Sequence, residues 1–130
     1  SKINDGESLE YEEGSAKGIV LHSSFCNLDH GLPARDLMIA ACSAFAEWAG
    51  HSRHSMLCVD ALAGSRLRSI RLALEVPAVG TIVSNDLSAT AHDVGLKNVN
   101  SHADALQRAG AAVELSNEDA GVLLHQLRST

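Results

Sequence analysis

The feature that most constrains the fold of this chain is a series of four short apolar runs, separated by longer segments of helical character. The runs occupy residues 19–22, 56–59, 79–83 and 111–115. Apolar runs of this length are typical of buried strands, and strands that alternate with helices pair in parallel through right-handed crossovers. The pattern therefore predicts an α/β domain with a central parallel sheet.

The amino-acid composition agrees with a fold in which helices outweigh strands. The chain contains 19 Ala and 17 Leu, but only 9 Val, 5 Ile and 3 Thr. Ala and Leu favour helices, whereas β-branched residues favour strands. We accordingly expect a small Rossmann-like or flavodoxin-like parallel sheet with flanking helices.

One segment leaves the choice of architecture open. Between residues 65 and 76, Leu67, Ile70 and Leu74 follow the spacing of a helix. Every second residue from Ile70 to Val76 is also apolar, however, as it would be in a strand. A following proline and a further apolar run favour a helix that leads into a buried strand. If the segment is a strand instead, the alternative is an α+β hotdog fold, with one central helix on an antiparallel sheet.

The strongest helical periodicity lies between Pro33 and Gly50, which are typical residues for the start and the end of a helix. The preceding residues 23–33 are rich in polar side chains and are expected to form a loop. Ser101 and Asn117 are expected to cap two later helices, whereas residues 85–100 allow either a helix or a long loop.

Size, charge and cysteine content limit the remaining possibilities. A chain of 130 residues with 45% apolar content is expected to fold as a single soluble domain. Residues 1–17 would form a flexible acidic start or a solvent-facing strand near 8–12. No stretch approaches the roughly 20 apolar residues that cross a bilayer, so we expect no membrane partner. Three cysteines, an odd number, indicate reduced thiols in the cytoplasm.

The charge of the chain argues against a nucleic-acid partner. The formal net charge is −6, and only Arg66, Arg68 and Arg71 cluster in the sequence. Phosphate binding needs clustered basic residues, and base stacking needs aromatic rings. With one Trp, one Tyr and two Phe, the sequence predicts a small-molecule ligand and no nucleic acid.

The C-terminal residues 101–128 carry a recognisable series of short motifs. They are Ala105-Leu106, Ala109-Gly110, Val113, Ser116, Gly121 and Leu123-Leu124-Leu127. In this order they resemble the end of the CoA-ligase domain in the succinyl-CoA synthetase α-subunit superfamily. The resemblance implies CoA or an acyl-CoA as ligand. The phosphohistidine segment of that family is not recognisable around His92, so its catalysis is not carried over.

A second pattern runs from Phe25 to Gly50, with Gly31-Leu32-Pro33 before a long helix, and continues with Arg66, Pro77 and Gly80. It resembles the hotdog fold of acyl-thioester dehydratases and thioesterases, and it implies an acyl-thioester ligand and a homodimer. In the dehydratases the central helix presents a catalytic carboxylate, whereas this chain has Met38, Ile39 and Ala40 in that region. A hotdog protein with this sequence would therefore be a variant or non-catalytic member.

Polar residues that follow the apolar runs make up the candidate ligand site. In open parallel sheets, ligands bind beyond the carboxyl ends of the strands. The α/β interpretation therefore predicts a ligand site formed by Ser23, Ser24, Gly64, Ser65, Ser84, Asn85 and Asp86, with Ser116 and Asn117 beside them. These residue types also serve as helix caps and turn residues.

The hotdog interpretation places Asn27, Asp29 and His30 near the active site, with Asp29 and His30 as candidate catalytic residues. No metal site is predicted, because the chain has no Cys-x-x-Cys pair and because Gly50 precedes the histidines at 51 and 54.

Three functions remain open from the sequence. The first is an α/β domain that binds a small anionic or CoA-type (phosphopantetheine) ligand, alone or as a subunit of a larger enzyme. The second is a hotdog homodimer that acts on an acyl thioester. The third is a non-enzymatic interaction subunit whose Ala-rich faces pack against a partner protein. The sequence does not decide whether the chain is an enzyme.

Overall fold

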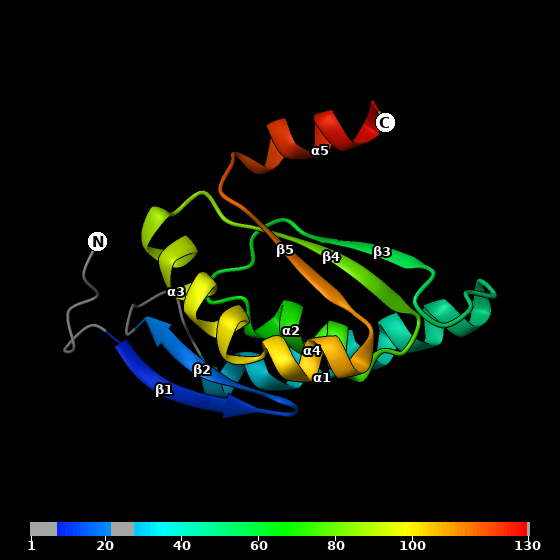
Figure 1. Ribbon diagram of the computed structural model, residues 1–130, viewed down its shortest axis with the longest axis horizontal. Helices are drawn as coiled ribbons and strands as arrows, with labels where there is room; N and C mark the ends of the chain where they lie inside the picture. The colour runs from blue at the N-terminus through cyan, green and yellow to red at the C-terminus, as the bar shows by residue number, and fades with distance from the viewer. Residues whose placement is uncertain (1–7, 22–27, 130) are drawn as a thin grey trace.

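The computed structural model describes residues 8–21 and 28–129, and it shows a hairpin followed by alternating helices and strands (Figure 1). The hairpin consists of β1 (Ser8–Glu13) and β2 (Ala16–Leu21). The elements that follow are α1 (Leu28–Trp48), β3 (Met56–Asp60), α2 (Leu67–Glu75), β4 (Val79–Asn85), α3 (Ala89–Ser101), α4 (Ala103–Ala109), β5 (Ala112–Ser116) and α5 (Ala120–Arg128).

Within the described residues, the central sheet is parallel and contains three strands in the order β3-β4-β5. Figure 1 shows α1 to α4 on one side of this sheet and α5 on the other. The expected α/β fold, a small parallel sheet with flanking helices, is therefore confirmed. In the register of the sheet, Asp60 lies opposite Ser84, and Asn85 lies opposite Ser116. The carboxyl ends of the three strands thus lie side by side.

The first apolar run does not join the parallel sheet. It lies in β2, which pairs antiparallel with β1, the strand expected near residues 8–12. Ala16 and Val20 of β2 are fully buried and pack with Leu67 and Ile70 of α2. Because α2 supplies an apolar surface on its side away from the sheet, the hairpin buries its own apolar face there.

The ambiguous segment at 65–76 is a helix, α2, as the α/β interpretation predicts. Leu67, Ile70 and Leu72 are buried together with Ala73, because α2 lies between the sheet and the hairpin. Val76 ends the helix in an extended conformation, and its N–H donates to the carbonyl of Leu72. The strand that a hotdog sheet would need at this place is absent from the described chain, so the alternative fold is wrong.

Some helix boundaries differ from those expected. α1 begins at Leu28, so part of the loop predicted at 23–33 is helical and Pro33 lies inside the helix. A proline in this place removes one backbone hydrogen bond, which a helix of 21 residues tolerates. Residues 89–101 form α3, which Ser88 caps by accepting from Ala91 N–H at 3.2 Å. Ser101 ends that helix, and Asp119 caps α5 in place of Asn117.

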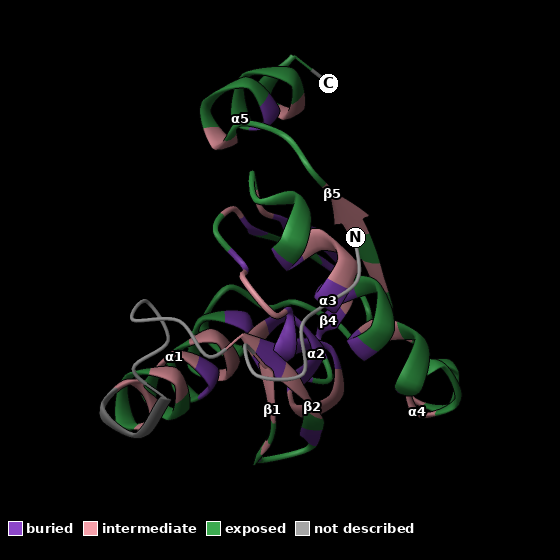
Figure 2. Cartoon of the chain, turned by 90° about the vertical axis from the view of Figure 1, so that its left-hand side faces the viewer, coloured by how far each residue is buried: buried purple, intermediate pink, exposed green. Residues whose placement is uncertain are grey.

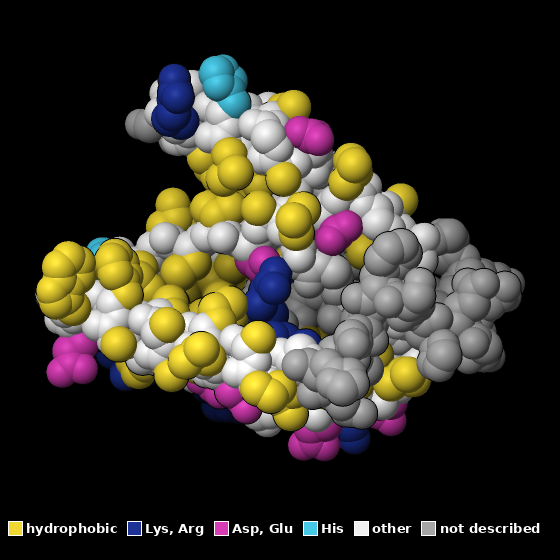
Figure 3. Space-filling view, turned by 180° about the vertical axis from the view of Figure 1, so that it is seen from behind, with side chains coloured by type: hydrophobic (Ala, Val, Ile, Leu, Met, Phe, Trp, Pro, Cys, Tyr) yellow, Lys and Arg dark blue, Asp and Glu magenta, His cyan; other side chains and the backbone are white. Residues whose placement is uncertain are grey.

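Buried residues concentrate around α2 and β4, whereas α5 is largely exposed (Figure 2). Seen from behind, apolar side chains line the hollow between α5 and α1 (Figure 3). Exposed apolar residues of α1, β3 and α5 include Leu37, Phe45, Trp48, Leu57, Val59, Val122 and Leu124. Among the described helices, none is long and apolar enough to cross a membrane.

Candidate functional site

Three loops meet at the carboxyl ends of the parallel strands, and the side chain of Asn85 joins two of them. Asn85 is fully buried at the end of β4. Its Nδ2 donates to the carbonyl oxygens of Ala61 (3.1 Å) and Glu118 (2.8 Å), and its Oδ1 accepts from the N–H of Glu118 at 2.9 Å. The loops after β3 and β5 are therefore held at a fixed distance on either side of β4.

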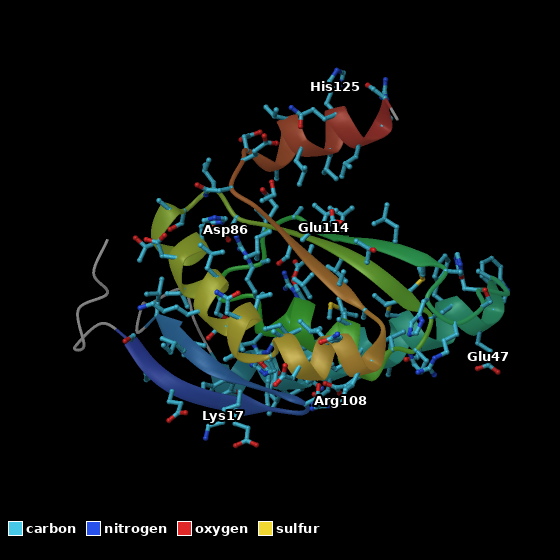
Figure 4. The ribbon with its side chains drawn as sticks, in the orientation of Figure 1. Lys17, Glu47, Asp86, Arg108, Glu114 and His125 are labelled. Atoms are coloured by element: carbon cyan, nitrogen blue, oxygen red, sulfur yellow. The ribbon has the colours of Figure 1, made fainter. Side chains whose placement is uncertain are left out.

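Asp86 follows Asn85 directly and presents a half-buried carboxylate at the same edge. Its Oδ2 accepts from the N–H of Gly64 at 2.9 Å, and its Oδ1 accepts from the N–H of Ser88 at 2.9 Å. Figure 4 shows Asp86 where β4 leads into α3. An ionised carboxylate offers about four lone-pair sites, so Asp86 retains acceptor capacity for a ligand that donates hydrogen bonds.

Asp60 and Ser84 lie below this edge and contact α2. The Asp60 carboxylate forms an ion pair with Arg68, which raises the pKa of the arginine, and it accepts from Ser69 Oγ at 2.8 Å. The hydroxyls of Ser69 and Ser84 lie 2.7 Å apart in the core. Because Asp60 and Ser84 are buried in this network, they anchor α2 to the sheet.

Arg66 lies between the loops and is fully buried. Its Nη1 donates to the carbonyl oxygen of Gly64 and its Nη2 to that of Ser116, both at 3.1 Å. Burial lowers the pKa of the guanidinium, while the charges of Asp86 and Asp60 act in the opposite direction. Arg66 therefore connects the loop after β3 with the end of β5.

The structure brings together part of the site predicted from the sequence. Gly64, Asn85 and Asp86 meet at the strand ends, whereas Ser65 uses its carbonyl to accept from Asn98 Nδ2 at 2.8 Å. Ser23, Ser24 and Asn27 lie outside the described residues. The candidate catalytic residues Asp29 and His30 lie in the first turn of α1, and their side chains are outside the described part of the structure.

The roles of Asp60 and Arg66 were missed from the sequence. The position of Asp60 at the end of the second apolar run is a signal that could have been used, because strand ends supply ligand-site residues in such sheets. The sequence carried no signal for Arg66 at this edge, since its place there depends on a contact with Ser116, far along the chain.

A groove of about 640 Å³ between the hairpin and α3 is a second candidate, lined by Glu10, Lys17, Lys97, Asn98, Ser101 and His102 among others. Its buried polar groups already have partners. Asn98 exchanges two hydrogen bonds of 2.7 Å with the backbone of Ile19, and His102 Nε2 accepts from the N–H of Lys17 at 3.2 Å. These contacts hold the hairpin to α3, so the strand ends remain the better site.

Among the described residues, no group of three or more His, Cys, Asp or Glu side chains could hold a metal ion. His51 lies 3.1 Å from Ser55 Oγ, and His54 Nε2 lies 2.6 Å from the carbonyl oxygen of Ala109. Cys42 and Cys58 are free thiols. Burial, followed by the neighbouring Cys42, raises the pKa of Cys58 from 9.0 to about 11.

We therefore expect Cys58 to be protected from alkylation in the folded protein. A rise of the pKa from 9.0 to about 11 reduces the reactive thiolate by roughly a hundredfold at neutral pH. Peptide mapping after iodoacetamide treatment should show slow modification of Cys58 in buffer and fast modification in urea. The thiol of the unfolded chain has the lower pKa and loses its proton at a lower pH than the thiol of the folded protein. The free energy of unfolding should therefore also fall as the pH rises above 9. Equal rates in the two solvents would contradict this prediction.

Comparison with known proteins adds an independent observation. Residues 25–130 match the sequence model of the family described as N2,N2-dimethylguanosine tRNA methyltransferase. A tRNA (guanine(26)-N(2))-dimethyltransferase of Pyrobaculum islandicum is 42% identical over 71 residues, which are 55% of this chain and 18% of that protein. The human protein of the same name is 41% identical over 68 residues, 52% of this chain and 10% of that protein. The chain thus spans less than a fifth of these relatives.

These matches overturn the functional expectations drawn from the sequence. The resemblances to the CoA-ligase domain and to hotdog proteins are wrong, and with them the expected CoA, acyl-CoA or acyl-thioester ligand. The CoA-ligase pattern was carried by residues that any helix–strand–helix unit favours, and α4, β5 and α5 form such a unit. The interaction-subunit hypothesis has no support from the matches.

The expectation of no nucleic-acid partner is also wrong, because the relatives are named for tRNA. The net charge of −6 is the sum over a chain that spans less than a fifth of the relatives quoted. Such a sum does not report on contacts that the rest of a longer protein makes. With its parallel α/β sheet and a family match from residue 25 to residue 130, this chain belongs to the N2,N2-dimethylguanosine tRNA methyltransferase family.

Proposed function

We propose that this chain supplies the methyl-donor-binding part of an enzyme that dimethylates N2 of guanosine in tRNA. The proposal is supported by family membership and by one observation, the acceptor carboxylate of Asp86 at the carboxyl end of the middle strand. In open α/β sheets this edge is where nucleotide-like ligands bind, and an acidic residue there accepts hydrogen bonds from ribose hydroxyls.

The donor that such methyltransferases imply is S-adenosylmethionine, which supplies an activated methyl group on a sulfonium sulfur. Two features of the strand ends suit its adenosine part. Asp86 keeps lone pairs for the ribose hydroxyls. At Gly64, an added Cβ would meet nothing within 4 Å, so the backbone of this loop is open to a close ligand.

The roles of the chain's own residues follow from these contacts. Asp86 would bind and orient the ribose, and Asn85 would keep the two flanking loops at the spacing that the ligand requires. A cytoplasmic location belongs to the same proposal, and the free thiols of Cys42 and Cys58 are in keeping with a reducing compartment.

Calorimetric titration with S-adenosylhomocysteine, the unreactive product form of the donor, tests the proposal. We expect saturable binding to the wild-type chain and about tenfold weaker binding to Asp86→Asn, since hydrogen bonds to a charged group contribute about 1.5–3 kcal/mol. Glu114→Gln is the matched control, because Glu114 is an exposed carboxylate on neighbouring β5 (Figure 4). Equal losses in the two variants, or no binding to the wild type, would reject this assignment.

A further inference from the structure

The residue that precedes α2 has a backbone conformation that glycine favours, yet it is an arginine. Arg66 has φ 71° and ψ 0°, in the left-handed region that side chains disfavour. It stands in the turn between β3 and α2, where nucleotide-binding folds use glycines so that the backbone can approach the ligand. The arginine side chain at this position therefore calls for a functional explanation.

The side chain of Arg66 fills the space between the loops and α3. A Cβ on Gly95 of α3 would lie 2.5 Å from Arg66 Cγ, so the arginine stem fits there because residue 95 has no side chain. Beyond the stem, the guanidinium reaches the carbonyls of Gly64 and Ser116. It thus occupies the region that joins the ends of β3 and β5.

Arg66 is poorly suited to a purely structural role. Within the described residues, its Nε is buried without a hydrogen-bond partner, and its Nη1 and Nη2 donate to backbone carbonyls. The charges of Asp86 and Asp60 favour the ionised guanidinium, but the hydrogen bonds described for these two carboxylates come from other groups. A buried guanidinium with an unmatched donor is costly, and such groups are uncommon in well-packed cores.

We propose that Arg66 sets the affinity of the strand-end site by occupying it. Its guanidinium holds two carbonyls at the edge where the adenosyl ligand would bind, so the ligand must displace it. This inference rests on the proposed function for the identity of the ligand. The bridge between the Gly64 and Ser116 carbonyls can be tested independently of any ligand.

The experiment compares Arg66→Gly, Arg66→Met and the wild type by titration with S-adenosylhomocysteine and by hydrogen–deuterium exchange. Glycine suits the left-handed backbone and removes the whole side chain, while methionine keeps the stem against Gly95 and removes the guanidinium. We expect about tenfold tighter binding for Arg66→Gly, a smaller gain for Arg66→Met, and no change for the control Arg108→Met, which alters an exposed residue of α4. In both Arg66 variants, residues 61–66 and 114–119 should exchange faster.

The outcomes separate the two proposals. Unchanged exchange in both Arg66 variants would show that the arginine does not hold the loops, and it would overturn the inference. Faster exchange with weaker binding would overturn it too, because Arg66 would then prepare the site for its ligand. Faster exchange with no binding to any variant would reject the proposed function and the competition, while it would confirm the bridge.

Discussion

Replacement of Arg71 by methionine is expected to destabilise the fold by about 4 kcal/mol, because removal of one partner from a buried ion pair costs about 3–5 kcal/mol. The Arg71 side chain is 5% exposed, and its Nη1 lies 2.8 Å from the carboxylate of Glu13, which is 2% exposed. Arg71 also pairs with Asp36 and Glu75, each at 2.8 Å. Without the guanidinium, the carboxylates of Glu13, Asp36 and Glu75 would lose the cation that they share. Glu13 would keep its ion pair with Arg35.

The pH dependence of stability distinguishes this electrostatic effect from a loss of packing. The hydrogen bond from Arg71 lowers the pKa of Glu75 below its ordinary value of 4.5. The stabilisation that this shift provides is present above pH 4.5 and is lost as the pH falls through the lowered folded pKa. In Arg71→Met the shift is removed. The difference in unfolding free energy between wild type and variant should therefore shrink on acidification below pH 4.5.

Urea unfolding at pH 7 and pH 4 measures the loss of unfolding free energy in Arg71→Met and the change of this loss with pH. Lys17→Met is the matched control, because Lys17 forms an ion pair with Glu10 in which both side chains are more than half exposed. Such surface pairs contribute at most about 1 kcal/mol, so this variant should unfold nearly as the wild type does. A cost for Arg71→Met as small as that of Lys17→Met, or one that does not change with pH, would contradict the assignment.

Replacement of Gly80 by alanine should cost about 3 kcal/mol, through overpacking that no side-chain rotation can relieve. Gly80 lies in β4, and its Cβ would fall on the backbone carbonyl of His54, closer than real atoms approach. His54 N–H donates to the Pro77 carbonyl and Met56 N–H to the Ala78 carbonyl. The chain before β3 therefore has to move away from β4 when residue 80 gains a side chain.

The appropriate comparison is Gly50→Ala, which separates crowding from backbone strain. Gly50 has φ 72°, and an added Cβ there would meet nothing within 4 Å. Its replacement should cost only the left-handed backbone penalty, about 1–2 kcal/mol. Chemical denaturation of both variants provides the test. If Gly80→Ala is no less stable than Gly50→Ala, the backbone of His54 does not crowd residue 80, and the prediction is contradicted.

The parallel sheet could be predicted from the sequence because its strands carry a local signal. Three of the four apolar runs are strands of that sheet, displaced by no more than two residues at either end. The prediction that the run at 19–22 joins this sheet was wrong, because an apolar run indicates that a strand is buried but does not indicate which strand it pairs with. Its partner, β1, is polar on one side and was recognised only as a strand facing solvent.

The candidate site could be predicted only in part. Asp86 and Gly64 follow from topology, since residues after parallel strands converge at one edge. Arg66 could not be recognised, because nothing in the sequence reveals a left-handed backbone or contacts 50 residues away. The three neighbouring arginines also appeared to form one basic cluster. In the fold Arg66 contacts the loops, Arg68 contacts Asp60, and Arg71 contacts Glu13.

The position of β3 at the edge of the sheet has a consequence for longer members of the family. Within the described chain, no strand pairs with the side of β3 that faces away from β4, and Leu57 and Val59 remain exposed on this strand. A further polypeptide segment can therefore extend the sheet there without displacing any existing strand. Growth in that direction would leave the hydrogen bonds of Asn85 and Asp86 intact. The strand-end site proposed above would thus keep its geometry whatever a longer relative adds beside β3.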